Sequence, residues 1–334
     1  MNNIENAIIV RNKTRLEQLT ERFNTQDQAK FYIKQSKQAF NFQQAAKSQK
    51  QSDVPIIEKE TDDFKMYDEE HRRFYQSFDY LQKSLAKLLK YKVIQQEFLP
   101  NYIFSEKDMV IVIGQDGLVA NTAKYVHNIP IIAVNPDQDR YDGVLLPFNQ
   151  HTVVQAIENV LADDYAFDLV TMAETELNDG QKLLAFNDFF IGPSNHSSAR
   201  YQISIGNQSE NHSSSGIIVS TGAGSTGWLS SLFNMANSIH HTFGNIQPLP
   251  YVPISKTENK LVFVVREPFL SKTSQISITS GILQEGDELI IESHMPQNGV
   301  IFSDGIQNDF LSFNSGAIAT IRITQAKAKL VNLK

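Results

Sequence analysis

The sequence of 334 residues contains no cysteine, and this absence excludes disulfide bonds and thiolate chemistry. It has no excess of positive charge either: the formal net charge is −7. This balance argues against an extended nucleic-acid surface, because phosphate backbones are bound chiefly by lysine and arginine. No run of apolar residues approaches the roughly 18 that a membrane span needs, and the N-terminus has no cleavage-site pattern. We therefore expect a soluble, cytoplasmic protein that binds neither nucleic acid nor membrane.

Glycine is absent until position 114, where the turn GQDG (114–117) follows the apolar run DMVIVI (108–113). This run is too short for a helix and rich in β-branched residues, which predicts a buried strand, and the small residues after the turn predict a helix. A strand, a glycine turn and a helix N-terminus present free backbone N–H groups, as in phosphate sites. A purely structural turn also fits the pattern. Asp116 favours chemistry at a phosphate, because a carboxylate can orient a hydroxyl or help to hold a metal.

A chain of this length is long for one hydrophobic core, so two domains are expected. Strands and helices alternate over residues 1–150, which predicts a Rossmann-like α/β domain with a mostly parallel sheet. Residues 151–334 begin with a short helix (151–161) and continue as alternating segments separated by turn residues, which predicts a β-rich domain resembling an antiparallel β-sandwich. The expected strands are 7–10, 92–98, 108–113 and 129–134 in the first domain, and 189–192, 200–205, 216–220, 260–266, 274–279, 288–292, 299–302 and 317–324 in the second.

Two helices are expected before the glycine turn. The polar segment 14–50 has widely spaced apolar residues and predicts a helix with a long solvated face. The apolar residues from Phe74 to Leu88 recur at spacings of four and three, which predicts a helix with one stripe buried against the sheet. A loop is expected at 51–63 between these helices, and Pro100 is expected to end the strand 92–98.

Asn135 follows the predicted strand 129–134, just as the glycine turn follows the strand before it. In open α/β sheets, ligands bind beyond the carboxyl ends of the strands, so both positions are candidates for a site. Asp137 and Asp139 come next in the chain. Two interpretations fit this pair of carboxylates: a metal site, or solvated residues of a polar loop.

A second turn rich in glycine and hydroxyl residues, STGAGSTG (220–227), continues from the strand 216–220 into a predicted helix from Trp228 to Ile239. Its N–H groups and hydroxyls suit ribose or phosphate oxygens. No lysine follows the last glycine in the required register, which excludes a Walker A loop. A flexible linker is the alternative interpretation, and Trp228 either stacks on a base or belongs to the core.

Asn187 and Asp188 lie at the entry to the apolar strand 189–192. An amide beside a carboxylate can recognise the edge of an adenine or the hydroxyls of a ribose. Ordinary turn residues at the start of a strand are the alternative interpretation.

The three motifs, in this order and architecture, resemble the NAD kinase family, whose signatures are a GGDG turn in an α/β domain, an Asn-Glu pair and a Thr/Gly/Ser-rich turn in a β-rich domain. The corresponding residues here are GQDG, Asn187-Asp188 and STGAGSTGW. The resemblance covers nearly the whole chain. Further stretches are similar to the mitochondrial-type branch: NKTRLE, NPDQDRYDGVLLPF, SSARYQISI, SSGIIVSTGAGS, VVREP, FSDG and NSGAIATIRI.

The resemblance implies transfer of a phosphoryl group from ATP, with Mg²⁺, to the adenosine-ribose 2′-hydroxyl of NAD, and a homodimer or larger homo-oligomer. Asp116 would orient and deprotonate that hydroxyl, while Gly114 and Gly117 would let backbone amides meet the phosphates. No metal ligand is assigned. The NAD-binding residues that it implies are Asn135, Asn187, Asp188, Thr221, Gly224, Ser225, Thr226 and Trp228, with Lys13, Arg200 and Asp304 as secondary candidates.

Three positions depart from the family pattern. Gln115 replaces the second glycine of the turn, which would strain the backbone by about 1–2 kcal/mol if the position needs a positive φ. Leu118 replaces a threonine and removes a hydroxyl, and Asp188 is one methylene shorter than the family's glutamate. These changes leave two other hypotheses open: a nucleotide-binding homologue with weak or no transfer activity, and a relative that acts on a lipid or another hydroxyl acceptor.

Overall fold

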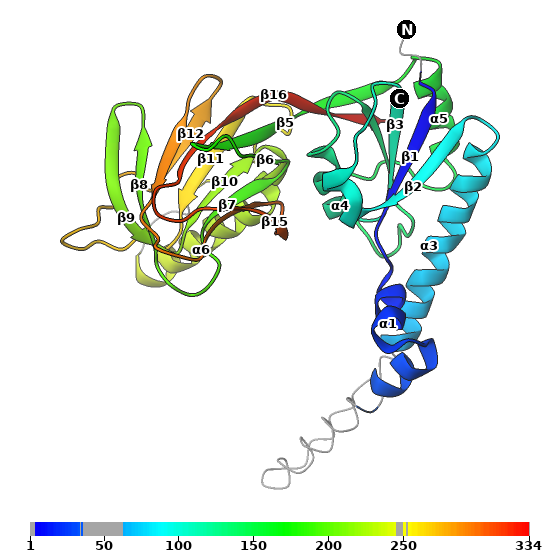
Figure 1. The fold of residues 1–334 in the computed structure, drawn as a ribbon, viewed down its shortest axis with the longest axis horizontal. Helices are drawn as coiled ribbons and strands as arrows, with labels where there is room; N and C mark the ends of the chain where they lie inside the picture. The colour runs from blue at the N-terminus through cyan, green and yellow to red at the C-terminus, as the bar shows by residue number, and fades with distance from the viewer. Residues whose placement is uncertain (1–3, 34, 36–62, 245–249, 252, 334) are drawn as a thin grey trace.

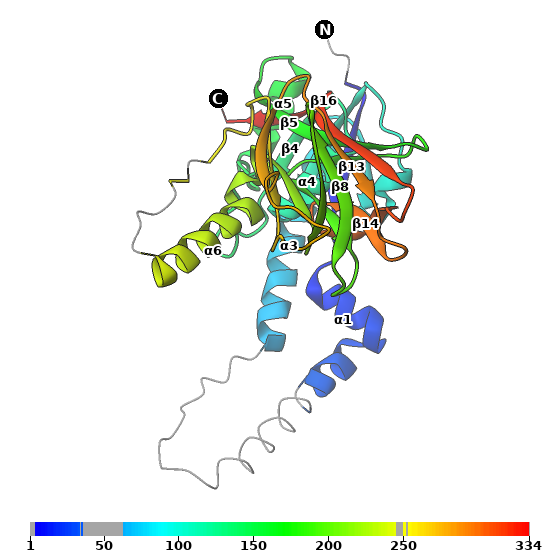
Figure 2. The same ribbon diagram turned by 90° about the vertical axis from the view of Figure 1, so that its left-hand side faces the viewer.

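The structure is a computed structural model that describes residues 4–33, 35, 63–244, 250, 251 and 253–333. It contains a ten-stranded and a six-stranded β-sheet, with most of the helices at one end of the larger sheet (Figure 1). Figure 2 shows that α1 (Arg15–Phe23) and α3 (Asp63–Leu85) extend away from the sheets side by side. No helix within the described ranges is long and apolar enough to cross a membrane.

The first domain has the predicted parallel sheet. Its strands lie in the order β2-β1-β3-β4, and neighbouring strands pair in parallel. Alternate side chains of a buried strand point to opposite faces, so Ile9 packs against α3 and α5 while Ile8 packs on the face that α4 covers. The bounds are β1 Asn6–Arg11, β2 Lys90–Gln95, β3 Asp108–Ile113, β4 Pro130–Val134, α4 Asp116–Ala123 and α5 Val153–Leu161.

The second domain is the predicted antiparallel sandwich. Its six-stranded sheet, in the order β12-β11-β10-β7-β14-β15, packs face to face on the antiparallel half of the ten-stranded sheet, and the two inner faces share one apolar core. The bounds are β5 Ala166–Leu177, β6 Lys182–Ala185, β7 Asp188–Pro193, β8 Ala199–Ile205, β9 Gln208–Ser214, β10 Ile217–Thr221, β11 Lys260–Val265, β12 Ser280–Gln284, β13 Leu289–Ser293, β14 Gly299–Ser303, β15 Ile306–Ser312 and β16 Ile318–Asn332.

Two long antiparallel strands, β5 and β16, run between the domains (Figure 1). The first part of β16 pairs with β13 in the sandwich, and its last part pairs in parallel with β4, so the larger sheet is continuous through both domains. The helix α5 and the end of β16 thus pack with the first sheet although they follow residue 150. The division at residue 150 stays a prediction.

Several predicted boundaries in the first domain are wrong. The helix expected over 14–50 is interrupted at Asn24, which has φ 62° and caps α1, and residues 36–50 lie outside the described part, as does nearly all of the loop expected at 51–63. Leu88 lies beyond the end of α3 and is 37% exposed. β2 ends at Gln95, before the 3-10 helix η1 (Gln96–Asn101) that contains Pro100.

In the second domain, the segment 274–279 is not a strand, and the strand that pairs with β11 is β12. The segment runs beside β9, but the Ser277 N–H donates to the Glu210 carboxylate rather than to a backbone carbonyl, so no ladder forms. The sequence prediction also missed β5, β6, β9 and β15. β9 is rich in Ser, Asn and Gln, which the strand pattern does not favour.

Candidate active site

The GQDG turn connects β3 to α4, and the helix begins at Asp116 itself, earlier than the run of small residues suggested. Gly114 is packed closely, because a Cβ placed there would lie 3.0 Å from Leu118 Cδ2. Gln115 has φ −112° and ψ 164°, which is extended backbone. The strain expected for a positive φ at Gln115 is therefore absent, and this departure from the family pattern costs the fold nothing.

Asp116 is partly buried in the first turn of α4, and its carboxylate is held by backbone. Oδ1 accepts a hydrogen bond of 2.8 Å from the Leu145 N–H, and Oδ2 accepts one of 3.3 Å from the Val144 N–H. A carboxylate has about four lone-pair directions, so each oxygen keeps one for a further donor. Asp116 is thus an oriented acceptor that remains able to bind a hydroxyl.

Asn135 shapes the loop that reaches Asp116 and is itself buried. Its side chain donates to Tyr141 O at 2.9 Å and accepts from the Asp137 N–H at 3.0 Å, so both ends of the amide serve the loop. Asp137 and Asp139 accept hydrogen bonds from Arg73 Nη1 at 2.7 and 2.8 Å. Within the described residues, no group of three or more acidic or histidine side chains is arranged to hold a metal. The hydrogen bonds from Arg73 favour the polar-loop interpretation of the pair, in which Asp139 is solvated and Asp137 is buried.

Gly117 offers a direct test of whether the turn faces a ligand. It is exposed in the first turn of α4, and a Cβ placed there would meet no atom within 4 Å. We expect Gly117→Ala to leave the free energy of unfolding unchanged or raise it by up to about 1 kcal/mol, since alanine is the better helix former. Binding of ATP and NAD, measured by calorimetry, is expected to weaken. Unchanged affinity for both would show that no ligand approaches this glycine.

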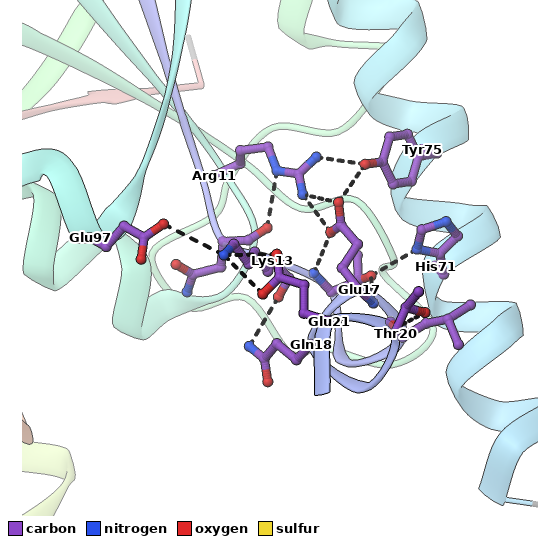
Figure 3. A network of polar contacts seen from close by, with 12 residues as sticks. Arg11, Lys13, Glu17, Gln18, Thr20, Glu21, His71, Tyr75 and Glu97 are labelled. Carbon is purple, nitrogen blue, oxygen red and sulfur yellow. Dashed lines mark hydrogen bonds and ion pairs between the residues drawn. The ribbon is translucent and has the colours of Figure 1, made fainter. Parts of the chain in front are cut away.

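The segment after β1 is fixed by a polar network that joins β1, α1 and α3 (Figure 3). Arg11 donates to Glu17 at 2.5 Å and to the Tyr75 hydroxyl at 2.9 Å, and Thr14 and Glu17 form a capping box at the start of α1. Burial, the largest influence, would raise the pKa of Glu17, but the hydrogen bonds from Arg11 and Tyr75 outweigh it and hold the pKa at about 2. Glu17 is therefore ionised at neutral pH, and the start of α1 has a defined position.

A cleft of about 250 Å³ lies at the carboxyl ends of β1 and β3. After β1 and after β3 the chain continues on opposite sides of the sheet. Ligands of such folds bind in the crevice between two strand ends of this kind. Lys13 and Arg15 bring positive charge to the cleft; Lys13 pairs with Glu21 at 2.9 Å, and Arg15 lies 3.6 Å from Glu70. The lining residues are Asn12, Lys13, Thr14, Arg15, Gln18, Glu70, Phe74, Ile113, Gly114, Gln115, Pro136 and Tyr141.

The second glycine-rich turn is ordered and packs on the Asn187-Asp188 motif. It follows β10 as a 3-10 helix, η2 (Ala223–Thr226), and leads into α6 (Trp228–Phe243). The Thr221 N–H donates to Asn187 O at 2.8 Å, and a Cβ placed on Gly224 would lie 2.2 Å from the same oxygen. The linker interpretation is therefore wrong for this turn, and two motifs far apart in sequence pack directly against each other.

The hydroxyls of this turn are not equally available to a ligand. Thr221 Oγ1 donates to Phe186 O at 2.5 Å and Ser225 Oγ donates to Gly222 O at 2.7 Å, and both residues are fully buried. Thr226 is exposed, and within the described residues its hydroxyl forms no hydrogen bond. Thr221 and Ser225 thus shape the turn, which leaves Thr226 as the hydroxyl able to meet a nucleotide.

Asp304, in the connection between β14 and β15, fixes the backbone of the Asn187-Asp188 motif. Its fully buried carboxylate accepts hydrogen bonds from the N–H groups of Phe186, Asn187 and Asp188 at 3.1, 2.6 and 3.3 Å. Asp188 is also buried, and no described residue donates a hydrogen bond to its carboxyl. Burial, together with the nearby charge of Asp304, raises the pKa of Asp188 to about 7. The protonated form of Asp188 is therefore populated near neutral pH, where it can donate as well as accept.

The raised pKa of Asp188 predicts how the stability of the fold depends on pH. Between about pH 4 and pH 7 the unfolded chain has released the Asp188 proton while the folded chain retains it, so this group lowers stability as the pH rises to 7. Asp188→Asn removes the titration. We expect the wild type to lose about 3 kcal/mol more than the variant between pH 5 and pH 8, in urea unfolding at each pH. Parallel pH profiles for the two proteins would contradict the raised pKa.

Trp228 follows the turn directly and packs on β7, whereas Arg200 lies away from these motifs. Trp228 stacks on Phe190 with ring centroids 5.9 Å apart, and the Arg266 guanidinium lies 5.6 Å from its ring, so the core interpretation is favoured over base stacking. Arg200 is exposed on β8, beside the edge strand β9 and far along the sheet from β3 and β4 (Figure 1). The structure does not bring Arg200 to the other candidate residues.

Sequence reasoning missed several residues that build the site. Val144 and Leu145 act through their backbone N–H groups, which no side-chain pattern reveals. Arg15 follows Lys13 in the NKTRLE stretch and was not singled out. Lys124 is the one charged residue in the segment LVANTAKYV (118–126), and a lone charge in a buried segment is a usable indication of a buried pair.

Comparison with known proteins finds no matching family model. An NAD kinase of Heliobacterium modesticaldum is 30% identical over 129 residues, which cover 36% of this chain and 44% of that protein. An NAD kinase of Finegoldia magna is 28% identical over 187 residues, 52% of this chain and 66% of that protein. The chain thus spans less than two thirds of the length of either curated relative.

Two solved structures have a similar fold. The crystal structure of yeast NADH kinase complexed with NADH superposes with a TM-score of 0.60 and 13% identity, covering all of this chain and 85% of that one. The crystal structure of an NAD kinase from Archaeoglobus fulgidus in complex with ATP gives a TM-score of 0.50 and 13% identity, covering 76% of this chain and 88% of that one. This chain is therefore similar in sequence to two proteins named NAD kinase, and its fold is similar to that of the two solved kinase structures.

Proposed function

We propose that this protein transfers a phosphoryl group from ATP to the adenosine-ribose 2′-hydroxyl of NAD and so forms NADP. The observation that carries the proposal is the carboxylate of Asp116, which is oriented by two backbone N–H groups at the glycine turn and keeps a free lone pair on each oxygen. The sequence relatives named NAD kinase support this choice of reaction.

In this mechanism Asp116 accepts the proton of the 2′-hydroxyl. The 2′-oxygen of the ribose bonds to the γ-phosphorus of ATP, while the bond from that phosphorus to the β–γ bridging oxygen breaks and ADP leaves. A fixed carboxylate contributes mainly by position, because phosphoryl transfer depends on alignment and charge neutralisation. The Asn187-Asp188 motif, joined to the STGAGSTG turn, would hold the adenosine half of NAD. Thr226 and the protonated form of Asp188 supply donors for ribose or adenine acceptors.

The cleft at the carboxyl ends of β1 and β3 suits the phosphoryl donor. Lys13 and Arg15 line it, and it reaches the Gly114–Gln115 side of the same turn that carries Asp116. Mg²⁺ in such sites is bound by donor phosphates and one or two carboxylates, so the absence of an acidic cluster among the described residues fits this mode of binding. The ion would be held by the donor phosphates and would neutralise charge on the transferred group.

A second candidate function is NAD binding without efficient transfer. Two observations favour it: Leu118 is buried against Gly114, where the family pattern has a threonine hydroxyl, and the exposed Gln115 side chain stands at the edge of the cleft. Loss of that hydroxyl removes a contact to the donor phosphates or their metal. This difference acts on transfer and leaves the adenosine motif in place.

The deciding experiment measures NADP formation by the purified protein with NAD, ATP and Mg²⁺, alongside calorimetry of NAD binding. We expect NADP to accumulate with ATP, and polyphosphate is tested in parallel as donor. NAD binding without NADP from either donor would support the second candidate. Indifference to NAD would favour the third hypothesis, a kinase for another hydroxyl acceptor. A homodimer or larger assembly and a cytoplasmic location are further expectations, which light scattering and cell fractionation test.

A further inference from the structure

Lys124 caps the C-terminal end of α4, and its side chain is only 2% exposed. Its ammonium donates to Ser303 Oγ at 2.8 Å and lies 3.8 Å from a carboxylate oxygen of Asp304 and from one of Asp309. A buried ammonium is costly unless it is paired and hydrogen-bonded, so this contact is a specific one. It joins the first domain, through α4, to the β14–β15 connection of the second.

The partner of Lys124 is the residue that holds the nucleotide motif. Asp304 has a left-handed backbone with φ 54°, and its side chain is 1% exposed. Besides accepting the three N–H groups of Phe186 to Asp188, it donates its own N–H to Asp188 O at 3.0 Å. The position of the first residues of β7 therefore depends on the position of Asp304.

The other end of the connection is the catalytic turn. Asp116 begins α4 and Lys124 follows its last residue, so the two lie about 12 Å apart along the helix axis at 1.5 Å per residue. The helix is short and buried from Leu118 to Ala123, which makes it a stiff spacer. One path thus runs from Asp116 through α4 and Lys124 to Asp304 and the Asn187-Asp188 motif.

We propose that Lys124 is a positioning residue, whose ion pair with Asp304 sets the distance between Asp116 and the motif that holds the adenosine of NAD. This inference rests on the proposed function. The strands β5 and β16 and the hydrogen bond from Tyr125 to Asp309 also join the domains, but among the described residues the Lys124 contact is the one that leads from α4 to Asp304. Its role is alignment of the 2′-hydroxyl with Asp116, and it has no contact with the reacting atoms.

The test compares kcat and KM for Lys124→Met with those of the wild type. Methionine keeps the length of the stem and removes the charge. We expect kcat to fall about 100-fold, the effect of a misplacement of about 1 Å, while KM for NAD changes little. Lys107→Met is the matched control, because Lys107 is an exposed lysine that pairs with Glu5 on the surface, and its kcat is expected to equal that of the wild type.

Alignment has to be separated from stability. Lys124→Met leaves Asp304 and Asp309 unpaired and can destabilise the fold, so its thermal unfolding is measured and kcat is determined at a temperature at which the variant is fully folded. If Lys124 aligns the site, kcat stays low in the folded Lys124→Met protein. Ser303→Ala, which removes only the 2.8 Å hydrogen bond, is expected to remain folded and to lower kcat severalfold.

The outcomes are distinguishable. Wild-type kcat in the folded Lys124→Met protein, together with wild-type kcat in Ser303→Ala, would overturn the positioning role and leave the proposed function intact. A wild-type protein that forms no NADP would overturn the proposed function, and with it this inference.

Discussion

Replacing Asp116 by asparagine is expected to lower the rate of NADP formation by about a hundredfold to ten-thousandfold, the range for loss of a general base. Asparagine cannot accept the proton of the 2′-hydroxyl. Its amide also places N–H groups where Oδ2 now accepts from Val144, so the side chain keeps only one of its two backbone partners. Steady-state kinetics with ATP and NAD measure the effect, and calorimetry shows whether NAD still binds.

Asp139→Asn is a matched control for that variant. Asp139 also accepts a hydrogen bond, from the Arg73 side chain, but its own side chain is 84% exposed and is not part of the glycine turn. The control is expected to have wild-type kcat. A folded Asp116→Asn protein that still forms NADP at the wild-type rate would remove Asp116 from the mechanism.

The second large effect is expected for Gly224→Ala. The added Cβ would lie 2.2 Å from Asn187 O and 2.6 Å from the carbonyl carbon of the same residue, and backbone atoms cannot move aside as a side-chain tip can. We expect the free energy of unfolding to fall by about 3 kcal/mol, the upper part of the range for overpacking. Affinity for NAD is expected to fall as well, because the clash displaces the Asn187-Asp188 motif.

Chemical denaturation and calorimetry at 25 °C test this variant against Gly117→Ala, which introduces the same methyl group where no atom lies within 4 Å. We expect Gly224→Ala to lower the free energy of unfolding and Gly117→Ala to leave it unchanged or raise it. Both substitutions are expected to weaken nucleotide binding. Equal stabilities for both variants would show that the STGAGSTG turn can move away from Asn187.

The sequence alone predicted those elements of the fold that are determined by residues close together in the chain. The strand β3, the GQDG turn and α4 follow one another within a few residues, and alternating apolar patterns located most strands of the sandwich. β9 escaped prediction because its inward-facing residues, Glu210, His212 and Ser214, are polar and form no apolar stripe. His212 and Ser214 contact the Tyr201 hydroxyl, and Glu210 accepts from the Ser277 N–H.

The site itself was predictable only in its motifs. Asp116 and the Asn187-Asp188 pair are candidates from the sequence, but their connection depends on the contact of Lys124 with Ser303 and Asp304. These residues are distant in sequence and adjacent only after both domains fold. Likewise, Asn135 was expected beside a nucleotide because it follows β4. Its side chain is instead committed to the loop that orients Asp116, a role that appears only when the loop's backbone is known.

The parallel pairing of β16 with β4 has a consequence for how this protein folds during its synthesis on the ribosome. The strands β1 to β4 emerge long before residues 318–332, so the edge at Pro130 and Ile131 stays open while the sandwich is still being translated. An open strand edge is a template for pairing with another chain. Nascent chains that stall within the second domain are therefore expected to aggregate and to engage chaperones, and release of β16 from the exit tunnel is the step that closes the edge.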